Sequence, residues 1–403
     1  MGQVFHKASI LLPQESVDMQ KWAVIACDQF TSDLAFWARV QEKVGDAPST
    51  LHMILPEAWL GQVDEPAYAR QVNETMARYL EEDVFQEIPA SFIYVERLLR
   101  NGKLRRGIVG AIDLDEYDTS AASNSVLRGS ERIIASRLPS RVQIRHTAPL
   151  EMPHVLLLID DPACSIVEQL GERDDLECLY DFDLMEDAGH LTGYRVTGEA
   201  ADQLAAAING LDIILVGDGN HSLVAAKMDW DAIKGDMSEE ERQNHPARYA
   251  LVELGNVHDR SLEIEPIHRI VFDVTGDLIG AFAASSPHVS MGAGDGYQIH
   301  FTDRGKPGVF TISGLTVGET IDLLQVFLDQ YVTEHGGEID YIHGDEELRT
   351  LSEQGGSVSF LMPTIEKSAL FTSVLQGGVF PKKSFSMGDG ADKRHYLECR
   401  KIK

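Results

Sequence analysis

A short apolar run that ends in a polar glycine turn constrains the fold more than any other feature of this sequence. The run "DIILV" ends at Val216, and the turn "GDGNHS" occupies residues 217–222 before an alanine-rich segment. Apolar residues recur at helical spacing over 197–210 and again from Ser222 onward. The pattern predicts a helix, a buried strand, a glycine turn and a second helix in succession, which is typical of α/β proteins.

The turn between this strand and the second helix carries residues that suit an anion site. A glycine turn that leads directly into a helix directs backbone N–H groups at whatever lies above the helix N-terminus. Asp218 and His221 can then handle a proton or a metal-bound phosphate. A second interpretation stays open, in which Asp218 and Asn220 only satisfy the backbone amides of a tight turn. The turn matches neither the P-loop nor the dinucleotide fingerprint.

The acidity of the chain argues against two classes of partner. The sequence holds 64 acidic and 35 basic residues among 403, a formal net charge of −29. Because such a surface is repelled by DNA and by anionic lipid, neither nucleic acid nor a membrane is an expected partner. No apolar run approaches the roughly 18–20 residues of a membrane span, so we expect a cytoplasmic protein. A homo-oligomer stays possible.

Residues 121–150 form a positive segment in this acidic chain. The segment holds five arginines and one glutamate, Glu131. Because the planar guanidinium group binds phosphate in a bidentate manner, the segment is a candidate phosphate site. The alternative is a helix face whose charges balance the acidic surface. The arginines are Arg128, Arg132, Arg137, Arg141 and Arg145.

Three further positions are candidate contacts to a phosphate or nucleotide. His268 and Arg269 follow Pro266, which fixes the backbone, and Lys383 lies in the basic, glycine-rich stretch "FPKKSFSMGDG". Each has a structural alternative, either hydrogen bonding within the fold or simple flexibility. Cys27 closes an apolar run and is interpreted as a buried thiol rather than as a nucleophile.

The alternation of helix-like and strand-like segments predicts a mixed α/β (α+β) architecture. We expect three units, at residues 1–124, 125–275 and 276–403. Two apolar runs flank Asn101-Gly102 in the first of them, which predicts a β-hairpin.

Five segments together resemble the bacterial domain-of-unknown-function family 1015. They are "WAVIACDQFTS", "GDGNHSLVAAK", "LEIEPIHRIV", "DYIHGD" and "FPKKSFSMGDG" with the following "KRHYLECRKI". The family's turn usually reads Asp-Gly-His-His-Arg, which is similar to the phosphate-binding turn of the ParB/sulfiredoxin-like fold and its free-serine kinases. The resemblance implies a core of that fold at 125–275, with N- and C-terminal flanking units.

Carried over residue by residue, the resemblance makes Asp218, Gly219, Asn220 and His221 the phosphate turn and Glu131 the base for a substrate hydroxyl. The sequence departs from the family pattern at Asn220, where a His is usual, and at Ser222, where an Arg is usual. Loss of that arginine removes a positive charge from a phosphate site. Either a nearby arginine, from residues 121–150 or Arg269, replaces it, or nucleotide binding is weak or absent.

The resemblance therefore implies a nucleotide-dependent phosphotransferase that acts on a small hydroxy metabolite, with ATP or ADP and Mg²⁺. His221 and the turn amides would hold phosphate, and Asp218 would position the metal or the acceptor. A non-catalytic sensor of a nucleotide or phosphorylated metabolite is the alternative, and the net charge argues against a DNA-associated ParB relative. The other expected binding residues are Gly217, Ser222, Arg132, Arg137, Arg141, His268, Arg269 and Lys383.

Overall fold

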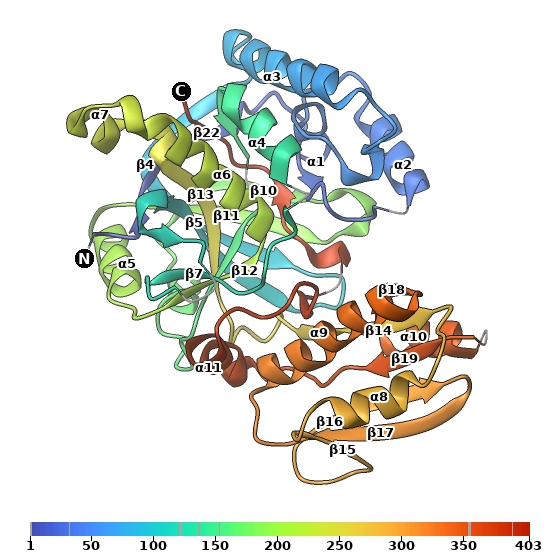
Figure 1. The fold of residues 1–403 in the computed structure, drawn as a ribbon. Helices are drawn as coiled ribbons and strands as arrows, with labels where there is room; N and C mark the ends of the chain where they lie inside the picture. The colour runs from blue at the N-terminus through green and yellow to red at the C-terminus, as the bar shows by residue number, and fades with distance from the viewer. Residues whose placement is uncertain are drawn as a thin grey trace. The chain divides into compact units, whose positions relative to one another are not determined.

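The computed structural model describes residues 2–31, 33–120, 123–135, 138–152, 154–353, 356–388 and 390–403. The chain forms two compact units (Figure 1). The first comprises residues 1–129, 134–262 and 389–403, and the second comprises residues 130–133 and 263–388. The mixed α/β class predicted from the sequence is confirmed.

This division differs from the three units expected from the sequence. The expected boundary near residue 125 falls inside a single sheet, because β4 (Phe85–Leu98) pairs with β11 (His190–Val196) and β5 (Leu104–Asp113) pairs with β13 (Tyr249–Asn256). The predicted hairpin at Asn101-Gly102 is confirmed: it joins β4 to β5, and Gly102 has a φ of 77°.

An eleven-stranded mixed sheet, counted over the described residues, forms the centre of the first unit. Its strand order is β10-β11-β4-β5-β13-β9-β12-β7-β6, with β1 beside β5 and β2 beside β4. The strands not yet given are β1 (Phe5–His6), β2 (Ala8–Pro13), β6 (Tyr117–Asp118), β7 (Leu127–Gly129), β9 (Leu156–Ile159), β10 (Glu177–Asp183) and β12 (Ile214–Asp218). Two small pairs add β3 (Val24–Ile25) with β21 (His395–Tyr396) and β8 (Leu150–Glu151) with β22 (Arg400–Lys401).

Both faces of this sheet are covered. Alternate residues of β4 point to opposite faces, as strand geometry requires, and they enter two different apolar clusters. Ile93 packs with residues of α2 and α3, whereas Phe92 packs with residues of α5 and α6. In addition, α4 packs against α3 and α6 (Figure 1). The helices are α1 (Met19–Trp22), α2 (Leu34–Val44), α3 (Glu65–Glu81), α4 (Leu138–Thr147), α5 (Gly198–Asn209), α6 (Asn220–Ile233) and α7 (Glu239–Asn244).

The second unit combines a seven-stranded sheet, within the described part of the chain, with four α-helices. Its longest helix, α9, begins with a capping box in which Thr316 and Glu319 satisfy each other's backbone amides. Its strands are β14 (Ile264–Phe272), β15 (Val289–Met291), β16 (Tyr297–Asp303), β17 (Lys306–Ile312), β18 (Glu338–His343), β19 (Val358–Leu361) and β20 (Phe385–Met387). Its helices are α8 (Leu278–Ser285), α9 (Val317–His335), α10 (Asp345–Glu353) and α11 (Lys367–Gly377). None of the described helices of either unit has both the length and the apolar character that a membrane crossing requires.

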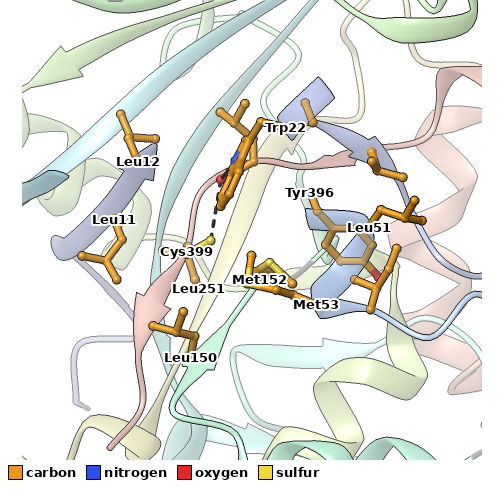
Figure 2. Packing of buried hydrophobic residues seen from close by; sticks show 14 of the residues in the cluster. Leu11, Leu12, Trp22, Leu51, Met53, Leu150, Met152, Leu251, Tyr396 and Cys399 are labelled. Carbon is orange, nitrogen blue, oxygen red and sulfur yellow. Dashed lines mark hydrogen bonds between the residues drawn. The ribbon is translucent and has the colours of Figure 1, made fainter. Parts of the chain in front are cut away.

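The last residues of the chain, 390–403, run through the core of the first unit. Figure 2 shows Tyr396 and Cys399 of this segment among Trp22, Met53 and other residues of one apolar cluster. The Trp22 indole donates to the carbonyl of Leu397 at 3.0 Å. This C-terminal segment is therefore a structural element of the first unit.

A buried arginine of β4 fixes the start of this C-terminal segment. The Arg97 guanidinium, 5% exposed, donates to the carbonyls of Ala391 at 3.0 Å, Asp392 at 3.1 Å and Lys393 at 2.6 Å, and to that of Ala188 at 3.0 Å. Burial, reinforced by the charge of Arg105, lowers the pKa of Arg97 to about 9, because the charged guanidinium is disfavoured away from water. Four carbonyl partners compensate for that loss of hydration.

Substitution of Arg97 should therefore be strongly destabilising. We expect Arg97→Ala to lower the free energy of unfolding by about 3 kcal/mol or more, because it leaves buried carbonyls without donors. Arg39→Ala is the control. Arg39 is half exposed where it pairs with Glu186, so this substitution should lower the free energy of unfolding by about 1 kcal/mol or less. Urea unfolding measures both, and equal losses in the two variants would contradict this role of Arg97.

Candidate functional site

The predicted succession of strand, glycine turn and helix is present as β12, Gly219 and α6. Gly219 has a φ of 77°, in the left-handed region that glycine adopts without strain. A methyl group added at Gly219 would lie 2.9 Å from Val155 Cα, and one at Gly217 would lie 2.6 Å from Leu158 Cδ1. Glycine suits both positions because the segment 155–158, which enters and forms β9, lies very close to them.

The N-terminus of α6 carries a charged pair. No described side chain caps the helix at its N-cap, Gly219. The Asp218 carboxylate accepts from the backbone N–H of Gly219 at 2.8 Å and from Lys393 Nζ at 2.9 Å. The Lys393 side chain is 9% exposed and that of Asp218 is 26% exposed. A lysine from the buried C-terminal segment therefore places a positive charge beside the predicted phosphate turn.

The antiparallel pairing of β9 with β12 brings a second group of polar residues to the same place. Leu156 lies opposite Asp218 in this pairing, so His154, just before β9, lies near the end of β12. His154 Nε2 is 3.7 Å from Asp28 Oδ2, and His154 Nδ1 is 2.7 Å from the Tyr396 hydroxyl. Tyr396 in turn donates to Cys27 Sγ at 3.1 Å. We call Cys27, Asp28, His154 and Tyr396 the histidine cluster.

Charge and burial set the protonation of the histidine cluster. Burial by itself raises the pKa of Asp28, but the charge and hydrogen bonding of His154, with contributions from Gln29 and Lys393, outweigh it and hold that pKa well below its usual value. Burial, reinforced by the Asp28 charge, raises the pKa of Cys27 to about 12. Cys27, which is half-buried, is therefore a thiol at neutral pH, and Asp28 is a carboxylate.

His221 and Asn220, in the first turn of α6, have definite roles in the local structure. His221 Nε2 accepts the backbone N–H of Ile134 at 2.8 Å, so the neutral ring carries its proton on Nδ1. This bond ties the chain just before α4 to the turn. The amide Nδ2 of Asn220 lies 3.5 Å from the Val216 carbonyl, whereas its buried Oδ1 has no hydrogen-bond partner among the described residues.

A cavity of about 160 Å³ within the first unit adjoins both groups. Ser222 and Leu223 of α6, and His154 and Tyr396 of the histidine cluster, are among its lining residues. Arg141 and Glu57 also line it and form an ion pair with each other. Most of the remaining wall is aliphatic.

The arginines expected to bind phosphate are divided between the two units. Arg132 belongs to the second unit and makes a bidentate pair with Asp322 at 2.9 and 3.0 Å. Arg269 is fully buried in that unit, where its Nε donates to Gln325 at 3.2 Å and burial lowers its pKa to about 10. Arg141 lies in the first unit, and Arg137 lies outside the described residues. Most of the positive segment thus forms separate ion pairs.

Three further predicted residues, Glu131, His268 and Lys383, belong to the second unit. Glu131 Oε1 accepts the backbone N–H groups of Ser384 at 3.0 Å and Phe385 at 3.2 Å, which fixes the start of β20. His268 is buried between the Asp345 carboxylate at 3.0 Å and the backbone N–H of Met362 at 3.1 Å. These contacts give Glu131 and His268 structural roles, and the catalytic role of Glu131 stays a prediction.

The expected Mg²⁺ has little support from the protein side chains alone. No group of three or more His, Cys, Asp or Glu residues within the described chain could hold a metal ion. Asp218 supplies one carboxylate beside the turn, and Lys393 already binds it. This donor set fits Mg²⁺ only as an ion that nucleotide phosphates bring with them, as one or two carboxylates commonly complete such sites.

The sequence analysis missed Lys393, Asp28, His154 and Tyr396. A signal was present for two of them, since Asp28 follows an apolar run and His154 precedes another, as Asp218 follows "DIILV". Lys393 and Tyr396 lie in the quoted segment "KRHYLECRKI". Their convergence depends on the strand order and on the buried course of the C-terminal segment.

The ionised Asp28 should give the fold a pH-dependent stability. Its pKa is lower in the folded chain than the value near 4 of an unfolded aspartate, so its contribution is complete above about pH 4 and is lost as the pH falls further. We expect Asp28→Asn to lower the free energy of unfolding by roughly 1–3 kcal/mol at pH 6, and this loss should shrink towards pH 3. Urea unfolding at several pH values tests it, with Asp174→Asn on the exposed surface as control. A loss that does not change with pH would contradict the ionised state of Asp28.

Three solved structures resemble the chain at low sequence identity. A variant of a free serine kinase in complex with ADP is 11% identical, with a TM-score of 0.43, and the match covers 74% of this chain and 93% of that one. A conserved hypothetical protein from Pyrococcus furiosus is 14% identical, with a TM-score of 0.38 and coverages of 71% and 90%. C-terminally truncated SbnI from Staphylococcus aureus is 9% identical, with a TM-score of 0.40 and coverages of 70% and 82%.

Family membership rests on the sequence itself. No curated protein matches the chain at a significant level. The profile of a family described as "Protein of unknown function (DUF1015)" matches residues 11–324, which is most of the chain. The chain belongs to the DUF1015 family.

Proposed function

We propose that the first unit binds the phosphates of a nucleotide at the N-terminus of α6 and transfers a phosphoryl group to a small hydroxy compound. The observation that carries this proposal is the position of Lys393, bonded to Asp218 at 2.9 Å beside a helix N-terminus that no described side chain caps. Lys393 supplies the positive charge that the family places at Ser222. A nucleotide site formed in this way needs none of the arginines predicted from the sequence.

Each group at the turn has a defined part in this proposal. The backbone N–H groups of the first helical turn and the positive end of the helix dipole favour phosphate oxygens. Lys393 adds a compact charge that can turn from Asp218 towards phosphate. Asp218 keeps Lys393 in place before the nucleotide arrives and is the available carboxylate for an incoming cation. A bound Mg²⁺ would supply charge neutralisation on the phosphates.

In this proposal the histidine cluster binds the hydroxyl group that accepts the phosphoryl group. Phosphoryl transfer passes through a loose transition state, so positioning and charge count for more than strong proton abstraction. His154 lies between an ionised Asp28 and the Tyr396 hydroxyl, and it lines the cavity next to α6. We assign to His154 and Asp28 the task of orienting the acceptor hydroxyl, in place of Glu131, and the hydroxyl proton passes to an oxygen of the transferred phosphoryl group as the new O–P bond forms.

A nucleotide sensor without catalysis is the second candidate function. One observation favours it: no cluster of metal-binding side chains exists in the described part of the chain, and Asp218 is already paired with Lys393. Phosphorus NMR of ATP with Mg²⁺ and simple alcohols separates the two candidates. Acceptor-dependent formation of ADP and a phosphate monoester supports the transferase, whereas tight ATP binding without turnover supports the sensor.

Removal of the Lys393 charge should weaken nucleotide binding. We expect Lys393→Met to reduce ADP affinity by roughly 10- to 100-fold, the effect of one hydrogen bond to a charged group. Isothermal titration calorimetry with ADP and Mg²⁺ at 0.15 M salt measures it. Lys401→Met is the matched control, because Lys401 lies in the same segment but is half exposed and paired with Glu87. Equal affinities of the two variants, or no ADP binding by the unmodified protein, would refute the proposed site.

A further inference from the structure

The cavity beside α6 has an unusual combination of walls. Its volume is about 160 Å³, close to the roughly 150 Å³ of engineered apolar cavities that bind benzene. Such a space holds a ring or a branched chain of about six carbon atoms. Figure 2 draws four of its lining residues, Met53, Met152, Leu251 and Tyr396, as sticks. Further aliphatic lining residues are Ile54, Ile144, Leu150, Leu223 and Ala226.

The polar groups of the cavity fall into two kinds. Arg141 bonds to Glu57 and Arg145 to Glu151, so these charges are already compensated within the wall. The Tyr396 hydroxyl, which meets His154 Nδ1 at 2.7 Å, is instead neutral, as are the hydroxyls of Ser140 and Ser222. The wall therefore matches a ligand with one neutral polar group and an apolar body.

A zwitterion matches this wall poorly. The ammonium and carboxylate of an amino acid would have to leave water and face mostly aliphatic side chains, which costs far more than transfer of a hydroxyl. Displacement of either ion pair to receive those charges would leave the other partner buried without compensation. A neutral hydroxyl can join the hydrogen bonds of Tyr396 and His154 at no such cost.

We propose that this cavity binds a neutral hydroxy compound whose apolar body has about six carbon atoms, and that this compound is the phosphoryl acceptor. The assignment as acceptor rests on the proposed function, because Ser222 and Leu223 belong both to the cavity wall and to the first turn of α6. Val155, another lining residue, packs directly on Gly219. The hydroxyl of a compound held at Tyr396 and His154 thus lies at the wall that continues into the phosphate turn.

The cavity ligand can be identified with probes of matched size. We expect calorimetry to rank benzyl alcohol above toluene and L-serine by about tenfold or more, because only benzyl alcohol has both an apolar body and a neutral hydroxyl. Tyr396→Phe should lower the affinity for benzyl alcohol to the affinity for toluene, and toluene should still bind. Across straight-chain alcohols, affinity should rise about fourfold per methylene until the cavity is full.

A cavity-filling variant controls for binding elsewhere. Ala226→Leu adds volume to the aliphatic wall and should abolish binding of benzyl alcohol and toluene. Ala205→Leu should leave this binding intact, because Ala205 is half-buried on α5 and does not line the cavity. If Ala226→Leu fails to fold, the probe ranking and Tyr396→Phe still decide the matter. Serine binding at least as tight as benzyl alcohol binding, or no binding of benzyl alcohol, would overturn the inference.

ADP is titrated into the unmodified protein in parallel. If ADP binds and benzyl alcohol does not, the acceptor pocket is wrong and the nucleotide site stands. If benzyl alcohol binds as expected and ADP does not, the cavity assignment stands and the phosphotransferase proposal falls.

Discussion

The buried guanidinium of Arg97 is the interaction on which the arrangement of the first unit depends. It joins a central strand, β4, to the carbonyls of Ala391, Asp392 and Lys393, and so fixes a segment that is almost 300 residues away in sequence. An arginine in a core is costly to desolvate, and the four carbonyls that accept from Nη1 and Nη2 of Arg97 offset that cost. Once the backbone of Lys393 is held there, its side chain reaches Asp218, and Tyr396 follows into the cavity wall.

Strand pairing supplies the second constraint. The antiparallel register of β9 against β12 sets Leu156 opposite Asp218, and this places His154 at the mouth of the predicted phosphate turn. The same close approach leaves no room for a side chain at Gly219, and a side chain at Gly217 would displace Leu158. Backbone amides, a lysine and the histidine cluster therefore lie in one region of a single unit. A site that aligns a phosphate with an acceptor needs these groups close together.

Local features of the sequence were predictable, whereas their convergence was not. The strand, turn and helix around Gly219 follow from hydrophobic spacing and turn chemistry, and the hairpin at Asn101-Gly102 follows from the same rules. Lys393 could not be foreseen, because its position depends on a tail buried by long-range bonds from Arg97. Glu131 and Arg269 matched the chemistry expected of a site, yet their partners lie in the second unit, where backbone amides and Gln325 occupy them. Residue type indicated what these side chains can bind, but only the fold determines which partner each one meets.

A crystal structure of the protein with ADP and Mg²⁺ tests the central claim most directly. The account predicts density for the phosphates against the backbone of residues 219–222, with Lys393 Nζ turned from Asp218 to within about 3 Å of a phosphate oxygen. Phosphates bound elsewhere, or a nucleotide that leaves the bond between Lys393 and Asp218 unchanged and the N-terminus of α6 without a ligand, would contradict it.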